Sequence, residues 1–207
     1  MEKMSSSSKK HTDWNALKEL VYNKAVILGY HKADLSQADD LYMMRFITGI
    51  TFAMKDRENC CMDYIGMDSH EDDFLIRGRT DEPGYWKLPY SMAECFARTI
   101  IRLLDYAGMK KIELNPDKFI PYISSEVTIY ENCYAIIARM VQKRYLNQFS
   151  EMVNGAISDI LELGNIENFN LLELLKFKVK FEDMNLFNYY WQTHDVPGQP
   201  LFSDLAE

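Results

Sequence analysis

The segment from Lys87 to Leu114 constrains the fold most strongly, because its pattern is that of a buried helix with a marked start and end. Pro89 fixes its own φ and lacks the N–H that a first helical turn leaves unbonded. Ser91 precedes Glu94 by three residues, which is the spacing of a capping box. Gly108 predicts a left-handed C-terminal cap. The apolar positions between these signals recur at close to the helical period and form a wide face: Phe96, Ala97, Ile100, Ile101, Leu103, Leu104 and Ala107.

Five further segments carry helical signals. Their predicted ranges are about 12–28, Leu41–Lys55, 126–146, Phe149–Leu163 and Leu171–Tyr190. The residues predicted to start or end them are Thr12 or Asp13, Ser124 or Ser125, Asn147 and Gly164. Pro116 also predicts a short helix or turn. The sequence therefore predicts an all-α protein, built as a helical bundle.

The domain organisation follows from the polar ends of the chain. Residues 1–11, with four consecutive serines, are predicted to be a disordered leader, and residues 193–207 an extended tail. Residues 12–192 then form a single all-α domain. A tandem repeat of halves 12–114 and 122–192 stays open, because Glu94 and Glu151 lie as far apart in the chain as Asp105 and Glu162.

Composition limits the functional classes. The chain has 207 residues, enough for a substantial core, and a net charge of −8, which disfavours non-specific binding to nucleic acid. No apolar run reaches the ~20 residues of a membrane helix, and no apolar signal core follows Met1. We therefore expect a cytoplasmic protein that does not enter membranes. The four cysteines form no C-x-x-C pair, which indicates reduced, mostly buried thiols rather than a metal site.

A resemblance to a known family lies in the second half of the central segment. The run Ile101-Arg102-Leu103-Leu104-Asp105, with Gly108 and Ile112-Glu113-Leu114 after it, is similar to the second motif helix of the MazG-like all-α nucleoside triphosphate pyrophosphohydrolases. Upstream, Tyr22 to Tyr30 resembles the entry helix of that family, and Leu41 to Arg57 its first motif helix. The resemblance implies a four-helix core, here with additional C-terminal helices.

The residues that bind magnesium in the family do not match. With Asp105 as the anchor, the implied carboxylate positions are Cys95 and Arg98 on the central helix and Gly49 and Phe52 on the helix before it. Magnesium needs oxygen ligands, which none of these four side chains supplies, and a guanidinium repels the ion. Shifting the alignment by one helical turn restores only one carboxylate ligand, Glu94. A single carboxylate is too few to hold two metal ions.

The first functional hypothesis is therefore a MazG-like protein without pyrophosphohydrolase activity and without a cofactor. It would act as a nucleotide- or phosphate-binding protein or in assembly, and the family resemblance also implies a homodimer. Arg98 and Arg102 lie one helical turn apart, and together with Lys55 they predict a phosphate-binding pocket, because guanidinium groups match phosphate oxygens. A structural pair of Arg102 with Asp105 is the alternative interpretation.

The second hypothesis is an active, magnesium-dependent pyrophosphohydrolase that uses other carboxylates. Its catalytic candidates are Glu94 and Glu151, and its metal-binding candidates are Glu131, Glu151 and Asp159. Asn154 follows Glu151 at the three-residue spacing of the family motif, with asparagine in place of aspartate. The alternative is that these carboxylates lie on the surface of amphipathic helices.

A third hypothesis is a helical adaptor unrelated to the family, which requires neither a ligand nor a four-helix core. The sequence also predicts a long irregular stretch over residues 58–86, rich in acidic residues. A solvated loop explains it best, and a cation site or a lid over a ligand is the alternative.

Overall fold

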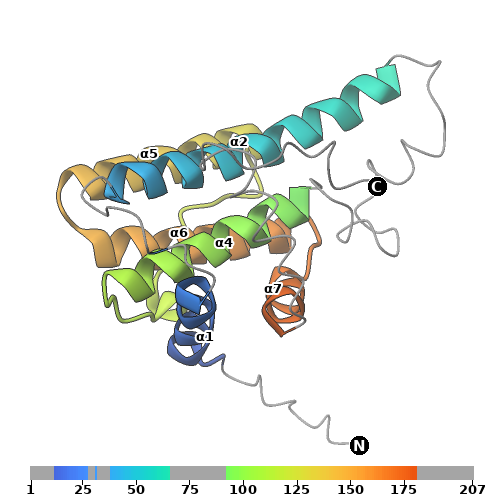
Figure 1. Ribbon diagram of the computed structural model, residues 1–207. Helices are drawn as coiled ribbons and strands as arrows, with labels where there is room; N and C mark the ends of the chain where they lie inside the picture. The colour runs from blue at the N-terminus through green and yellow to red at the C-terminus, as the bar shows by residue number, and fades with distance from the viewer. Residues whose placement is uncertain (1–11, 28–30, 32–37, 66–91, 181–207) are drawn as a thin grey trace, which may run out of the picture.

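The computed structural model describes residues 12–27, 31, 38–65 and 92–180 (Figure 1). The helices in these ranges are α1 (Trp14–Ile27), α2 (Ala38–Ile65), α4 (Met92–Met109), α5 (Ile129–Tyr145), α6 (Phe149–Ile166) and α7 (Leu171–Lys180), with a 3-10 turn η2 (Pro116–Lys118). The described ranges contain no strand, so the prediction of an all-α helical bundle is confirmed. The predicted leader and tail lie outside the described residues.

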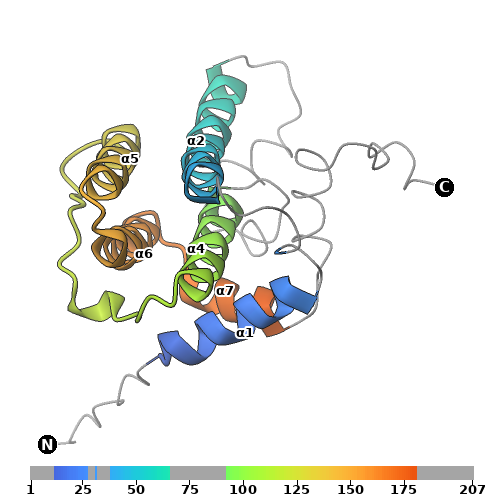
Figure 2. The same cartoon turned by 60° about the vertical axis from the view of Figure 1, so that its left-hand side comes forward.

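Helix α4 is the central element of the bundle. Every residue from Met92 to Gly108 is buried, and α1, α2, α6 and α7 all pack against it (Figure 2). Helix α5 packs at the edge, against α2 and α6. Because α4 is covered on all sides, each of its charged side chains needs a partner inside the protein.

One hydrophobic core joins the two halves of the chain. A continuous cluster of buried apolar side chains runs from Trp14 in α1 to Val179 in α7 and includes residues of each described α-helix. Equivalent positions of the suggested repeat also differ in environment, since Glu94 is buried and Glu151 is exposed. The described residues of the ranges 12–114 and 122–192 thus share one core.

Helices α4, α5 and α6 end in the same type of cap. Each is followed by a non-glycine residue with positive φ: Lys111 at 56°, Asn147 at 56° and Asn168 at 61°. After α4, the N–H of Ile112 donates to the carbonyl of Ala107 at 2.8 Å, and the N–H of Lys111 donates to Gly108 at 3.1 Å. This pair of bonds is a Schellman motif, and the same pattern closes the other two helices.

The prediction that Gly108 and Gly164 end their helices is wrong, whereas Asn147 does end α5. Both glycines lie inside helices and permit close packing. A Cβ atom on Gly108 would lie 2.4 Å from Cβ of Tyr22, and one on Gly164 would lie 2.4 Å from Cδ1 of Leu171. The residues with left-handed φ are found three and four positions later, at the exposed Lys111 and Asn168.

Helix α2 is longer than the sequence analysis predicts. It runs over Ala38–Ile65 rather than Leu41–Lys55, so residues 58–65 of the predicted irregular stretch are helical. The added turns contain neither glycine nor proline before Gly66, and polar residues alone do not stop a helix. The remainder of that stretch, residues 66–86, lies outside the described residues.

Helix α5 begins at Ile129, later than predicted, and Thr128 rather than Ser124 or Ser125 is its N-cap. The hydroxyl of Thr128 accepts from the N–H of Glu131, and the Glu131 carboxylate accepts from the N–H of Thr128 at 2.8 Å. This complete capping box explains why Thr128 caps the helix. Neither Ser124 nor Ser125 is followed three residues later by an acidic residue, so neither can form such a box. The predicted cap of α1 is confirmed, since the Asp13 carboxylate accepts from the N–H of Ala16 at 2.9 Å.

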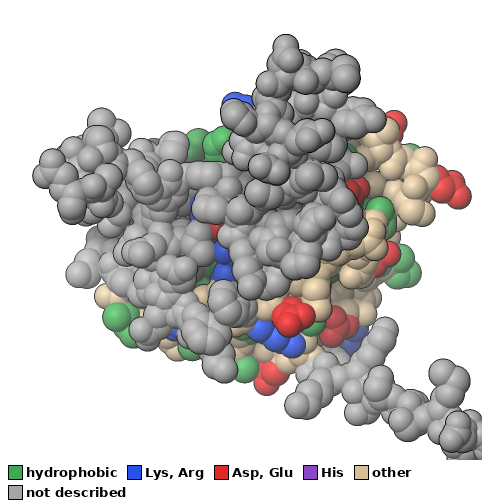
Figure 3. Space-filling view, turned by 90° about the vertical axis from the view of Figure 1, so that its right-hand side faces the viewer, with side chains coloured by type: hydrophobic (Ala, Val, Ile, Leu, Met, Phe, Trp, Pro, Cys, Tyr) green, Lys and Arg blue, Asp and Glu red, His purple; other side chains and the backbone are tan. Residues whose placement is uncertain are grey.

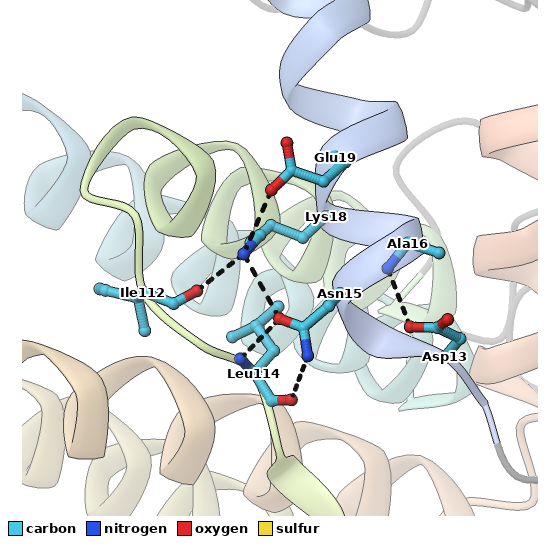
Figure 4. Close-up of polar contacts among 7 residues, drawn as sticks. All are labelled: Asp13, Asn15, Ala16, Lys18, Glu19, Ile112 and Leu114. Carbon is cyan, nitrogen blue, oxygen red and sulfur yellow. Dashed lines mark hydrogen bonds and ion pairs between the residues drawn. The ribbon is translucent and has the colours of Figure 1, made fainter.

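The connection between α4 and α5 is held by side chains that bond its backbone. Asn15 of α1 bonds both the N–H and the carbonyl of Leu114, at 2.9 and 3.0 Å, and Lys18 reaches the carbonyl of Ile112 at 3.0 Å (Figure 4). From α5, Asn132 bonds both backbone groups of Ser124 in the same manner. These bonds satisfy polar backbone groups that no helix or sheet pairs, and they attach the connection to the bundle.

Among the described helices, none combines the length and the apolar character that crossing a membrane requires.

Candidate functional site

The candidate site lies at the N-terminal half of α4, where it packs against α7. Glu94 is 1% exposed, and its Oε1 accepts from Nε of Arg98 at 2.5 Å and from Nζ of Lys178 at 3.1 Å. Arg98 is one helical turn after Glu94, and Lys178 comes from α7. One buried carboxylate therefore holds two cationic groups from two helices in fixed positions.

Arg102 extends this group one helical turn further along α4. Its side chain is 4% exposed, and NH1 donates to the backbone carbonyl of Arg45 on α2 at 3.0 Å. We call Glu94, Arg98, Arg102 and Lys178 the cationic cluster. Its side chains carry three positive charges and one negative charge, in a region where charges interact more strongly than in water.

Among the side chains of described residues that are visible in Figure 3, acidic and basic groups lie near one another. The cationic cluster differs from such a surface because its members are buried. Ion pairs on a surface contribute little to stability, whereas a buried charge is costly unless it is paired or bound.

Asp105 does not use Arg102 as its partner among the described residues. It is fully buried and accepts a hydrogen bond from the hydroxyl of Tyr42, and its other oxygen lies 2.9 Å from Nε2 of His31. Burial and the neighbouring Asp105 carboxylate raise the pKa of Tyr42 far above its ordinary value. Tyr42 therefore stays protonated and remains a donor. The Asp105 carboxylate thus joins α4 to α2 and to the segment that contains His31.

The four positions implied for magnesium ligands lie at or near the crossing of α2 and α4. A Cβ atom on Gly49 would lie 2.2 Å from Oγ1 of Thr99, so the two helices are in direct contact there. Cys95 is 4% exposed, and its carbonyl accepts from Thr99 at 2.8 Å. Phe52 packs against the core. Among the described residues, none of these four positions supplies a carboxylate, and Arg98 adds a positive charge that is bonded to Glu94.

Lys55, the third residue predicted to bind phosphate, is exposed on α2. No contact among the described residues joins it to Arg98 or Arg102. The structure thus brings two of the three predicted residues together and adds Lys178, which sequence analysis missed. A signal for it was present, because Lys178 follows the buried Leu171 and Leu174 at helical spacing and so interrupts an apolar face.

The carboxylates proposed for an active enzyme have separate roles. Glu131 belongs to the capping box of α5, where bonds from Thr128 lower the pKa of its carboxyl group. Glu151 is exposed and pairs with Lys143. Asp159 is buried and accepts from NH1 of Arg139 at 3.0 Å and from the N–H of Tyr122 at 2.7 Å; burial raises the pKa of its carboxyl group. No group of three or more His, Cys, Asp or Glu side chains suited to a metal occurs in the described part of the chain.

Asn154, which the resemblance aligns with an aspartate, forms hydrogen bonds with backbone groups. Its Oδ1 accepts from the N–H of Asn115 at 2.6 Å, and its Nδ2 donates to the carbonyls of Glu113 and Ser150, at 3.1 and 2.9 Å. Both ends of the amide are used, so a carboxylate in this position would place an oxygen against two carbonyl oxygens. Asparagine is therefore required by the local hydrogen bonds.

We expect Asn154→Asp to lower the free energy of unfolding by about 2 kcal/mol, because a donor to two carbonyls becomes an acceptor. Denaturant unfolding at neutral pH measures this. Asn165→Asp is the matched control, since Asn165 is exposed on the same helix and its side chain donates to Glu162, the one side-chain bond it makes with a described residue. It should change stability by less than about 0.5 kcal/mol. Equal effects of the two substitutions would contradict the role given to Asn154.

Comparison with known proteins adds no relative: no family model matches the sequence, and neither a curated protein nor a solved structure matches it significantly. The resemblance to the MazG-like family thus rests on the motif residues between Leu20 and Leu114 alone.

Proposed function

We propose that this chain is a MazG-like helical protein that lacks magnesium-dependent pyrophosphohydrolase activity and binds the phosphate group of a nucleotide at the cationic cluster. The observation that carries the proposal is the convergence of Arg98 and Lys178 on Glu94. The family resemblance implies metal-binding carboxylates at Cys95 and Arg98, in the same N-terminal half of α4. Here the same region carries fixed cations, which attract phosphate oxygens without a bridging metal ion.

The chemistry of the cluster favours an anion with several oxygens. Arg98 and Arg102 present planar guanidinium groups, which form paired hydrogen bonds to phosphate, and Lys178 adds a compact charge. Glu94 keeps Arg98 and Lys178 positioned before a ligand arrives, so little ordering entropy is lost on binding. In this proposal a phosphate oxygen takes the place of the Glu94 carboxylate as the partner of one of the two cations. No cofactor is needed, and we place the protein in the cytoplasm.

Titration calorimetry with a nucleoside triphosphate tests the proposal, once in excess magnesium and once in EDTA. We expect binding in both conditions, because the site uses cationic side chains rather than a metal. Lys178→Gln should weaken binding at least tenfold, about 1.4 kcal/mol. Lys176→Gln is the matched control on the same helix: Lys176 is exposed, and within the described ranges its side chain bonds Thr12 and none of the cationic cluster, so its replacement should leave the affinity unchanged.

Two results would overturn this function. One is the absence of binding heat in both conditions. The other is equal weakening by Lys178→Gln and Lys176→Gln, which would indicate non-specific attraction of the ligand to surface charge. Thermal unfolding of both variants shows whether they are equally stable. This control is needed because Lys178→Gln removes one of the cationic partners of the buried Glu94 carboxylate.

A further inference from the structure

Asn154 is followed by Gly155 inside α6, and the full sequence contains no other asparagine followed by glycine. Such a pair is reactive in a flexible chain, because glycine has no side chain to hinder attack of its backbone nitrogen on the preceding amide. The packing does not demand glycine here: an added Cβ atom would meet the guanidinium of Arg139 at 3.1 Å, the far end of a flexible side chain. Glycine also disfavours a helix relative to alanine. The structure of α6 therefore gives no reason for glycine at this position.

The reaction of this pair needs water and no cofactor. The Gly155 nitrogen forms a bond to Cγ of Asn154, the Cγ–Nδ2 bond breaks, and ammonia leaves with the proton of the Gly155 N–H. Water then opens the resulting cyclic imide at one of its two carbonyl groups. The product is aspartate, or isoaspartate when the main chain continues through the side-chain carbon. Either product is an acid where the native chain has an amide.

The fold blocks this reaction through burial, hydrogen bonding and helix geometry. Asn154 is 2% exposed. Its Oδ1 accepts from the N–H of Asn115 at 2.6 Å, and its Nδ2 donates to the carbonyls of Glu113 and Ser150. The Gly155 nitrogen lies in the interior of α6, where each N–H donates to the carbonyl four residues earlier. Closing the imide ring requires this backbone to rotate out of the helical range, which breaks that ladder of bonds.

We propose that Asn154 is a modification site that deamidates only after α6 has opened and released the α4–α5 connection. Figure 2 shows this connection beside α6 on its way from α4 to α5. Next to Asn154, Ser158 donates to the carbonyl of Phe119 at 2.9 Å, and Asp159 accepts from the N–H of Tyr122. Loss of these contacts exposes the amide and lets the backbone rotate. Units of this size open locally at a lower free energy than the whole protein.

Deamidation is irreversible and prevents the connection from returning to its native bonds. Aspartate places an oxygen against the carbonyls of Glu113 and Ser150, which the Asn154 amide binds as a donor. Isoaspartate adds an atom to the main chain and so interrupts the hydrogen-bond ladder of α6. A chain that has stayed open long enough to react is thus marked by a negative charge. This inference is independent of phosphate binding, because the cationic cluster lies on α4 and α7.

Peptide mass spectrometry of the full chain, incubated at neutral pH with and without denaturing urea, tests the proposal. In urea we expect Asn154 to deamidate faster than every other asparagine. Without urea its rate should fall at least tenfold, an opening free energy of about 1.4 kcal/mol. Gly155→Ala should slow the reaction in urea at least tenfold, because the new methyl group hinders the attacking nitrogen. The comparison in urea does not depend on how well the variant folds.

Ser158→Ala tests whether opening controls the rate. It removes the bond to the Phe119 carbonyl and leaves the Asn154 amide as it is. The rate without urea should therefore rise about fivefold, the effect of one lost hydrogen bond, and the rate in urea should not change. Ser125→Ala is the matched control, since Ser125 is exposed on the same connection and no hydrogen bond within the described ranges holds its hydroxyl. It should leave both rates unchanged.

Three results would overturn the proposal. The first is equal deamidation of Asn154 with and without urea, which would show that the fold does not protect it. The second is a rate in urea no higher than that of the other asparagines. The third is a rate without urea that Ser158→Ala leaves unchanged, which would show that release of the connection does not limit the reaction.

Discussion

Replacing Asp105 by alanine is expected to lower the free energy of unfolding by about 3 kcal/mol, the largest effect of any single substitution considered. The carboxylate is fully buried and is bonded to Tyr42 and His31, two groups from different parts of the chain. Without it, the Tyr42 hydroxyl loses its acceptor in a place that water does not reach. Denaturant unfolding, followed by circular dichroism, measures the change.

Asp105→Asn distinguishes the stability lost with the hydrogen bond from the stability lost because alanine leaves a cavity. Asparagine keeps the volume and one acceptor, so it should retain the bond to Tyr42 and lose about half as much stability as alanine. Glu113→Ala is the control, because Glu113 is exposed beyond the end of α4. An alanine variant as stable as the wild type would show that Asp105 does not join α4 to its neighbours.

The second large effect is expected for Gly108→Ala, at about 2 kcal/mol of lost stability. The new methyl group would lie 2.4 Å from Cβ and 2.6 Å from Cγ of Tyr22. These atoms are next to the backbone of α1 and cannot turn away, so α1 and α4 must separate. The gain of about 1 kcal/mol from alanine in a helix offsets only part of that cost.

Gly155→Ala is the matched control for Gly108, since both glycines lie inside helices. At Gly155 the nearest atoms belong to the guanidinium of Arg139, 3.1 Å away, at the far end of a flexible side chain. The helix propensity gain should then dominate, and stability should stay the same or rise. If Gly108→Ala is equally well tolerated, the close approach of α1 to α4 is not what requires glycine there.

The fold could be predicted largely from local signals. The apolar period identified α4 as the central buried helix, and proline and asparagine located η2 and the end of α5. The errors concern helix ends. Gly108 and Gly164 are required by Tyr22 and Leu171 on other helices, and a packing contact of that kind leaves no local trace. Where two residues could serve as the N-cap of a helix, as Ser124 and Thr128 could for α5, the residue that forms a complete capping box is the N-cap.

The candidate site could be predicted only in part, because its members come from elements far apart in the chain. Arg98 and Arg102 were found from their spacing on one helix, but Lys178 is 80 positions later and reaches Glu94 only after α7 packs on α4. Lys55 was included because of its charge, and its exposed position could not be known before α2 was placed. The spacing predicts Arg102 as a local partner of Asp105, whereas its partners among the described residues, Tyr42 and His31, come from other parts of the fold.

The most direct test of the central claim is an assay of pyrophosphate release from nucleoside triphosphates by the purified full chain in excess magnesium. We expect no release above the buffer control, because the four positions that the proposed family resemblance implies for magnesium ligands are Gly49, Phe52, Cys95 and Arg98, which supply no carboxylate. Pyrophosphate formed in proportion to protein concentration, and abolished by Glu94→Gln or Glu151→Gln, would contradict the account and establish an active enzyme.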